Sequence, residues 1–157
     1  MTQPASYPTV DSAPTSTDAP IRRASPKVAV SRFFGRYATF AGRSSRSEYW
    51  WIALLNVIVF FGGSLLALVI QSAVVGQTAT GTGETEFAPA AVVVMVVMVL
   101  YFLAVFIPGI ALTVRRLHDI DFSGGWILLA LFPTFGAIVL LVFTLLPSNP
   151  EGARFDR

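Results

Sequence analysis

Two short polar motifs, residues 42–50 and 115–126, hold most of the side chains in this sequence that could bind a charged group or act in catalysis. The candidate residues are Arg43, Arg46, Glu48, Arg115, Arg116, His118, Asp119 and Trp126. Guanidinium groups hold phosphate and carboxylate oxygens bidentately. The motifs therefore fit either a site for an anionic headgroup or partner, or ion pairs that orient the protein in a membrane.

Catalysis and metal binding have less support in the sequence. His118 next to Asp119 could form an acid–base pair, and a serine of either motif could complete a Ser-His-Asp arrangement. None of these serines lies in a Gly-x-Ser-x-Gly sequence. His118 is the only histidine and there is no cysteine, so a zinc site would need carboxylates, which are few. We therefore expect no enzyme, no metal and no cofactor.

We expect the two motifs to contact each other through ion pairs. If the apolar segments between them pack antiparallel, both motifs lie at the same membrane surface, where a partly desolvated ion pair is weakly screened. Glu48 is expected to contact Arg115 or Arg116, and Asp119 to hold the remaining guanidinium or His118. A serine at position 44 or 45 is expected to cap the helix that follows.

The elements that position these motifs follow from the distribution of charge. No Lys or Arg lies between Arg46 and Arg115, and residues 122–150 carry no charge of either sign. Charged residues are 13% of the chain, against about 25% in typical soluble domains. An ionised side chain at the bilayer centre costs about 3 kcal/mol or more. We therefore predict an all-α integral membrane protein, with no basic face for nucleic acid.

Three apolar segments are expected in the membrane domain, which covers residues 28–157. Residues 49–75 and 90–114 are long enough to form two firm transmembrane helices. The first carries a stripe of small and amide side chains, which lets another helix approach closely: Asn56, Gly63, Ala67 and Gln71. The third segment, residues 126–146, is interrupted at Pro133, so it forms either one kinked span or a re-entrant pair of half-helices.

The remaining sequence lies before the first span. Residues 1–27 are rich in Pro, Ser and Thr and are predicted to be a disordered cytoplasmic tail. Residues 28–41 place aromatic and Arg side chains on opposite faces, which is typical of a helix lying in the membrane interface. The positive-inside rule places the N-terminus in the cytoplasm and the cation-free loop 76–89 outside. The path of the third segment decides the side of the C-terminus.

The order of the motifs resembles a known family. Gly42-Arg43, then Arg46 with Glu48-Tyr49-Trp50, a span, and Arg115-Arg116-Leu117-His118-Asp119 with Ser123 and Trp126 are similar to the YhaH-like inner-membrane protein family (domain of unknown function 805). The similarity covers about residues 28–157. It implies a small multi-pass protein of the bacterial cytoplasmic (inner) membrane with an unassigned molecular activity.

These observations favour a non-enzymatic membrane component whose cytoplasmic Arg/His/Asp cluster binds anionic lipid headgroups or a protein partner. The alternative is a subunit of an oligomeric transporter or channel, in which Asn56, Gln71 and Thr113 line a pore between copies. A membrane-bound enzyme is the third alternative. The expected partners are therefore membrane lipids, with a homo-oligomer or a membrane protein partner also open, and not nucleic acid.

Overall fold

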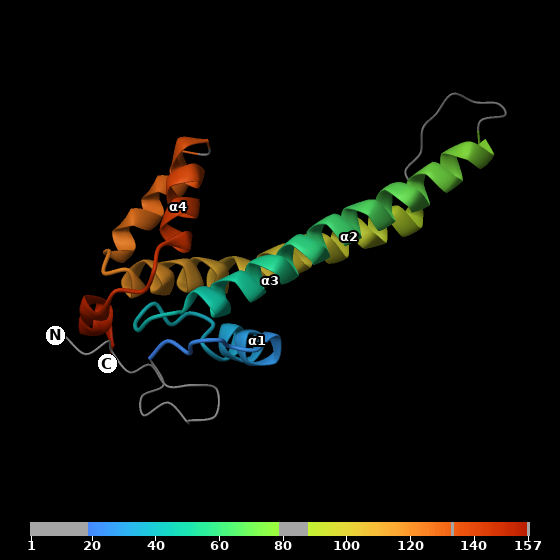
Figure 1. Ribbon diagram of the computed structural model, residues 1–157. Coiled ribbons are helices and arrows are strands. Elements are labelled where there is room, and N and C mark those ends of the chain that lie inside the picture. Colours follow the sequence, from blue (N-terminus) through green and yellow to red (C-terminus); the bar gives the residue numbers. More distant parts are fainter. Residues whose placement is uncertain (1–18, 79–87, 133, 157) are drawn as a thin grey trace. The chain divides into compact units, whose positions relative to one another are not determined.

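The computed structural model describes residues 19–78, 88–132 and 134–156, and in these residues it contains helices and no strands. The elements in chain order are α1 (Pro26–Gly35), α2 (Arg46–Thr78), α3 (Pro89–Asp119), the 3-10 helix η1 (Gly124–Leu131), α4 (Phe135–Leu145) and the 3-10 helix η2 (Pro150–Phe155) (Figure 1). The predicted all-α class is confirmed. The chain divides into two compact units, Met1–Ala53 with Phe106–Arg157, and Leu54–Val105.

Two helices, α2 and α3, are long and apolar enough to cross a membrane. Their candidate spans, Arg46–Val74 and Pro89–Asp119, contain 29 and 31 residues. At 1.5 Å per residue these reach about 45 Å, well over the roughly 30 Å of a bilayer core. Their large apolar side chains are exposed, for example Phe61 at 65% and Val93 at 62%. A surface of this kind needs lipid around it, which agrees with an integral membrane protein.

Within the unit Leu54–Val105, α3 packs along the stripe of small and amide residues on α2 (Figure 1). The Asn56 side-chain oxygen accepts a hydrogen bond from the Tyr101 hydroxyl at 3.0 Å. Gly63 lies against Met98, whose sulfur would be 2.3 Å from a Cβ added at the glycine. The Gln71 side-chain oxygen accepts from the Ala88 N–H at 2.9 Å, just before α3 begins. The stripe therefore serves helix packing, as predicted.

The third apolar segment turns back on itself. η1 ends at Leu131 and α4 begins at Phe135, and these two elements pack side by side (Figure 1). The rings of Phe122 and Phe143, which lie on opposite sides of this turn, have centroids 4.9 Å apart. The 11 residues of α4 reach about 16 Å, about half of a bilayer core. The segment therefore forms two packed half-helices, which is the arrangement of the re-entrant alternative.

Before α2, the helix ends earlier than the sequence suggests, and the packed part of the chain begins earlier. α1 ends at Gly35, whereas the predicted interfacial helix continues to residue 41. Ile21 and Ala24 are buried, and the Ile21 carbonyl accepts from the Ser45 hydroxyl at 2.6 Å. The packed part therefore begins earlier than residue 28, while residues 1–18 of the predicted disordered tail lie outside the described residues. Two apolar residues are too few to give a periodic signal.

The close contact between η1 and α4 depends on Gly136. A Cβ at this position would lie 1.7 Å from the Leu129 carbonyl oxygen, a backbone atom that moves only with its helix. We expect Gly136→Ala to separate the half-helices and to destabilise the protein by about 3 kcal/mol or more. Gly62→Ala is the matched control, because nothing lies within 4 Å of a Cβ there. Equal melting temperatures of the two variants in detergent would contradict this packing.

Candidate functional site: a buried ion-pair cluster

The two polar motifs lie against each other in the unit formed by Met1–Ala53 and Phe106–Arg157. The Ser44 N–H donates to the Arg115 carbonyl at 3.1 Å. His118 Nδ1 lies 3.2 Å from the Gly42 carbonyl oxygen. The end of α3 therefore packs on the segment that leads into α2, so the motifs meet, and these contacts are hydrogen bonds to backbone oxygens where ion pairs with Glu48 were expected.

The first turn of α2 is held by a reciprocal capping arrangement. The Ser45 N–H donates to Glu48 Oε2 at 2.7 Å, and the Glu48 N–H lies 3.3 Å from the Ser45 hydroxyl oxygen. This satisfies two backbone donors at the helix start. Glu48 Oε1 also forms an ion pair with Arg32 of α1 at 2.8 Å. Arg115 or Arg116 was expected opposite Glu48, and the structure instead has Arg32 of α1 there.

Asp119 and Arg116 form the most deeply buried ion pair. The two side chains are 0% and 1% exposed, and Arg116 donates to Asp119 Oδ2. The Ser148 hydroxyl donates to the same carboxylate oxygen at 2.5 Å. This pairing of Asp119 with a guanidinium was expected from the sequence. Ser148 was missed, because it lies 29 residues further along an uncharged segment.

Arg116 also binds the C-terminal end of α4. Its guanidinium donates to the Thr144 carbonyl at 3.3 and 3.2 Å and to the Leu146 carbonyl. The last carbonyls of a helix have no partner within the helix and carry its negative end of the dipole. Arg116 therefore joins the ion pair at the end of α3 to the re-entrant hairpin.

The turn after α3 fixes the direction in which the hairpin leaves. Asp121 adopts a left-handed conformation, with φ of 67°. The Asp121 N–H donates to the His118 carbonyl at 3.1 Å and the Phe122 N–H to the Leu117 carbonyl at 2.9 Å. These two bonds form a Schellman-type helix end. The Asp121 carboxylate pairs with the exposed Arg154 at 2.9 Å.

The segment η2 covers one side of the cluster. Asp156, which directly follows it, binds Arg43 through both carboxylate oxygens, each 3.0 Å from Nε. The Phe155 ring stacks on His118 with a centroid distance of 4.1 Å and an interplanar angle of 5°. Gly152 lies so close that an added Cβ would be 2.3 Å from the His118 carbonyl oxygen. Asp156 is a partner of Arg43 that sequence spacing gave no signal for.

Most of the cluster is closed to external ligands. Five of its charged side chains belong to buried residues: Arg43, Arg115, Arg116, Glu48 and Asp119. Charges in such positions need partners inside the protein, because leaving one unpaired costs several kcal/mol. The predicted role of Arg115 and Arg116 as a direct grip on lipid phosphate is therefore not supported by their burial.

The arrangement of these groups does not form a Ser-His-Asp relay. His118 faces the Gly42 carbonyl and the Phe155 ring, whereas Asp119 faces Arg116 and Ser148. Within the described ranges, no three His, Cys, Asp or Glu side chains come together as metal ligands. The cluster can hold charge and join helices, and the carboxylate that accepts from the Ser148 hydroxyl is itself buried against Arg116.

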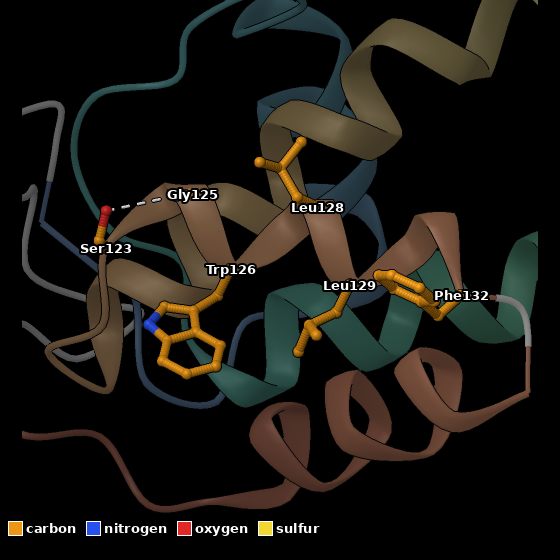
Figure 2. A pocket seen from close by; sticks show the side chains of 6 residues that line it. All are labelled: Ser123, Gly125, Trp126, Leu128, Leu129 and Phe132. Carbon is orange, nitrogen blue, oxygen red and sulfur yellow. Dashed lines mark hydrogen bonds between the residues drawn. The ribbon is translucent and has the colours of Figure 1, made fainter.

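Two of the predicted site residues lie at the surface. Arg46 is exposed, with its guanidinium 3.5 Å from the Leu145 carbonyl oxygen. Trp126 is 47% exposed and lies in an open groove along η1. The groove is lined by Ser123, Gly125, Trp126, Leu128, Leu129 and Phe132 (Figure 2). Its polar end is Ser123, whose hydroxyl accepts from the Gly125 N–H at 3.3 Å, and the rest of its lining is apolar.

Comparison with known proteins identifies the family. The profile of the family described as Protein of unknown function (DUF805) matches residues 37–157. The chain belongs to this family. The DUF805 match contains both polar motifs and all elements from α2 onward, which confirms the resemblance seen in the sequence.

Two relatives of this DUF805 protein are inner-membrane proteins of Escherichia coli strain K12. The chain is 39% identical to the inner membrane protein YhaI over 107 residues, which are 68% of this chain and 74% of YhaI. It is 34% identical to the inner membrane protein YhaH over 119 residues, which are 76% of this chain and 85% of YhaH. No solved structure matches the chain.

The burial of Arg116 and Asp119 predicts strong energetic coupling. We expect Arg116→Gln and Asp119→Asn each to lower the free energy of unfolding by about 3–5 kcal/mol, because each leaves a buried charge unpaired. The double variant should lose clearly less than the sum, as measured by denaturant unfolding in detergent micelles. The control cycle is Arg154→Gln with Asp121→Asn, a pair with Arg154 62% exposed. It should show about 0–1 kcal/mol of coupling. Additive losses at Arg116 and Asp119 would contradict the role of this pair.

Proposed function

We propose that this DUF805 protein is a non-enzymatic component of the inner membrane that binds anionic phospholipid headgroups at its cytoplasmic face. The observation that carries the proposal is the sign of the accessible charge. In the described part of the chain five cationic residues are exposed: Arg22, Arg23, Lys27, Arg46 and Arg154. Glu151 is the one exposed acid among the same residues. The exposed charge of the described residues is therefore mainly positive, which supports the proposal.

Exposed aromatic rings accompany these cations. They are Phe34, Tyr37, Phe40, Trp50 and Trp51, each between 38% and 46% exposed. Trp and Tyr favour the headgroup level of a membrane, where the ring is half in hydrocarbon and half in water. A surface Lys or Arg gains about 1 kcal/mol from anionic lipid. Together these exposed cations and rings, which we call the basic rim, have the composition of a headgroup-binding surface.

The proposal divides the predicted site residues into two groups. Arg46 belongs to the basic rim, and Trp50 lies four residues along α2 and so on the same face. Arg43, Arg115 and Arg116 belong instead to the buried cluster. We assign Arg115 and Arg116 to the rigid platform that holds the rim in place, and the preference for anionic lipid to Arg46 and its exposed neighbours.

A transporter built from several copies has less support. The polar side chains that could line a pore are used inside one protomer. Asn56 binds Tyr101, Gln71 binds the Ala88 N–H, and Thr113 binds the Gly109 carbonyl at 2.9 Å. Each of these bonds would have to be exchanged for water or an ion in a conducting state.

The orientation of the protein is part of the proposal and has its own test. The end of α3 binds both the start of α2 and the turn η2, so we place the C-terminus in the cytoplasm with the Arg-rich segment. Green fluorescent protein fused after residue 157 should fluoresce, and alkaline phosphatase fused there should be inactive. A cysteine introduced at Thr82 should react with an impermeant maleimide in intact cells, and one at Ser123 should not. An active phosphatase fusion would contradict this orientation.

The lipid preference is tested by removing rim charge. We expect Lys27→Gln with Arg46→Gln to lower the preference for phosphatidylglycerol over phosphatidylcholine by about fivefold per cation, from about 1 kcal/mol each. Electron paramagnetic resonance of spin-labelled lipids in reconstituted membranes measures this ratio. The control is Lys27→Arg with Arg46→Lys, which keeps both charges and should keep the preference. A wild-type protein with no preference, or an unchanged ratio in the Gln variant, would rule out the proposal.

A further inference from the structure

The contact between Arg43 and Asp156 has the geometry of an occupied anion site. Arg43 Nε lies 3.0 Å from each carboxylate oxygen, and Nη2 lies 2.5 Å from Oδ2. The two side chains are 8% and 20% exposed, so the carboxylate lies at the opening and the guanidinium lies beneath it. A guanidinium holds phosphate oxygens with the same bidentate geometry.

A second donor points to the same place. The Gly42 N–H donates to the Phe155 carbonyl oxygen at 3.0 Å. Three oxygens therefore face two neighbouring donor groups. The Phe155 carbonyl oxygen accepts from the Gly42 N–H, and the two Asp156 carboxylate oxygens accept from the Arg43 guanidinium. Gly42 has φ of 81°, which favours glycine, and without a side chain its N–H is open to close approach. A phosphate group offers the same number of acceptor oxygens on one atom.

The charge behind this site is mixed, with guanidinium groups in excess over the carboxylates of Asp119 and Glu48. Arg115 and Arg116 are both 1% exposed, and the Ser44 N–H bonds the Arg115 carbonyl directly beside Arg43. Arg43 and Arg116 are both close enough to Asp119 to act on its charge. An anion bound at Gly42 and Arg43 would therefore lie in the field of several guanidinium groups in a poorly solvated region.

The turn that supplies Asp156 packs on the cluster through Gly152 and Phe155, and its other side faces outward. Glu151, Ala153 and Arg154 of η2 are exposed. The ion pair between Arg154 and Asp121 is one of its holding contacts, and an exposed pair of this kind contributes little. The stacking of Phe155 on His118 is the larger contact. The turn is therefore better placed to exchange with a ligand than the buried pairs are.

We infer that Gly42 and Arg43 form a binding site for a phosphate group, either of a phospholipid headgroup or of a soluble phosphate ester, and that Asp156 occupies this site when no phosphate is bound. Binding of the phosphate displaces the Asp156 carboxylate and frees the turn η2. The site contains neither Lys27 nor Arg46, so it does not depend on the basic rim and is tested separately from it.

The first test removes the internal anion. The full chain in dodecyl maltoside micelles, which contain no phosphate, is titrated with inorganic phosphate and with dihexanoyl phosphatidylglycerol by isothermal titration calorimetry. Asp156→Asn should bind at least one probe about tenfold more tightly than the wild type. Glu151→Gln removes the same charge from the same turn without touching Arg43 and should bind like the wild type. Binding of inorganic phosphate assigns the site to soluble phosphates, and binding of the lipid probe alone assigns it to headgroups.

The inference is overturned if Asp156→Asn binds neither probe more tightly than Glu151→Gln does. A second measurement decides the matter even if Asp156→Asn does not fold. The sequence has no cysteine, so a spin label on a cysteine at Ala153 reports on η2 alone in the otherwise unchanged protein. Saturating probe should make this label mobile, while sodium chloride at the same ionic strength should not. A label that stays immobile at saturation shows that no anion replaces Asp156.

Discussion

Ion pairs removed from water at one end of the membrane helices determine the rest of this structure. An ionised group beside the hydrocarbon of a bilayer must find its partner inside the protein, because the hydrocarbon offers none. Each pair joins two separate segments. Arg32 with Glu48 joins α1 to α2, and Arg43 with Asp156 joins the segment before α2 to the end of η2. The pair of Asp119 and Arg116 joins α3 to the end of α4 through helix carbonyls.

The same constraint separates residues that look alike in the sequence. Arg43 and Arg46 are three positions apart in one motif, yet Arg43 is buried against a carboxylate and Arg46 is exposed. The buried cations contribute rigidity and the exposed ones contribute surface charge. Among the described residues, the excess of exposed cations over exposed acids follows from the inward pairing of Glu48 and Asp119, and not from a large excess of cations in the chain, whose net charge is only +2.

The sequence was sufficient to predict the features that depend on the composition or spacing of residues over a whole segment. The charge-free stretches predicted the apolar helices, and the stripe from Asn56 to Gln71 predicted the packing face of α2. The meeting of the two motifs followed from antiparallel spans. The path of the third segment did not follow, because an interruption at Pro133 is compatible with a kink and with a reversal. The close approach of Gly136 to Leu129 favours the reversal, and it is visible only in three dimensions.

The ion-pair partners were less predictable for a different reason. The sequence pattern put Arg32 on the face of α1 opposite its aromatic residues. In the structure the aromatic residues are divided, because Phe33 is buried and Phe34 is exposed. Arg32 lies on the side of α1 that meets Glu48. An amphipathic pattern of ten residues does not determine which arc meets the protein. Arg43 and Asp156 are 113 residues apart. At about 5–20 residues per second, a ribosome makes Asp156 roughly 6–23 seconds after Arg43. Both membrane helices are made within that interval, so closure of this pair is a late step of biogenesis that requires α3 to have entered the membrane in the correct direction.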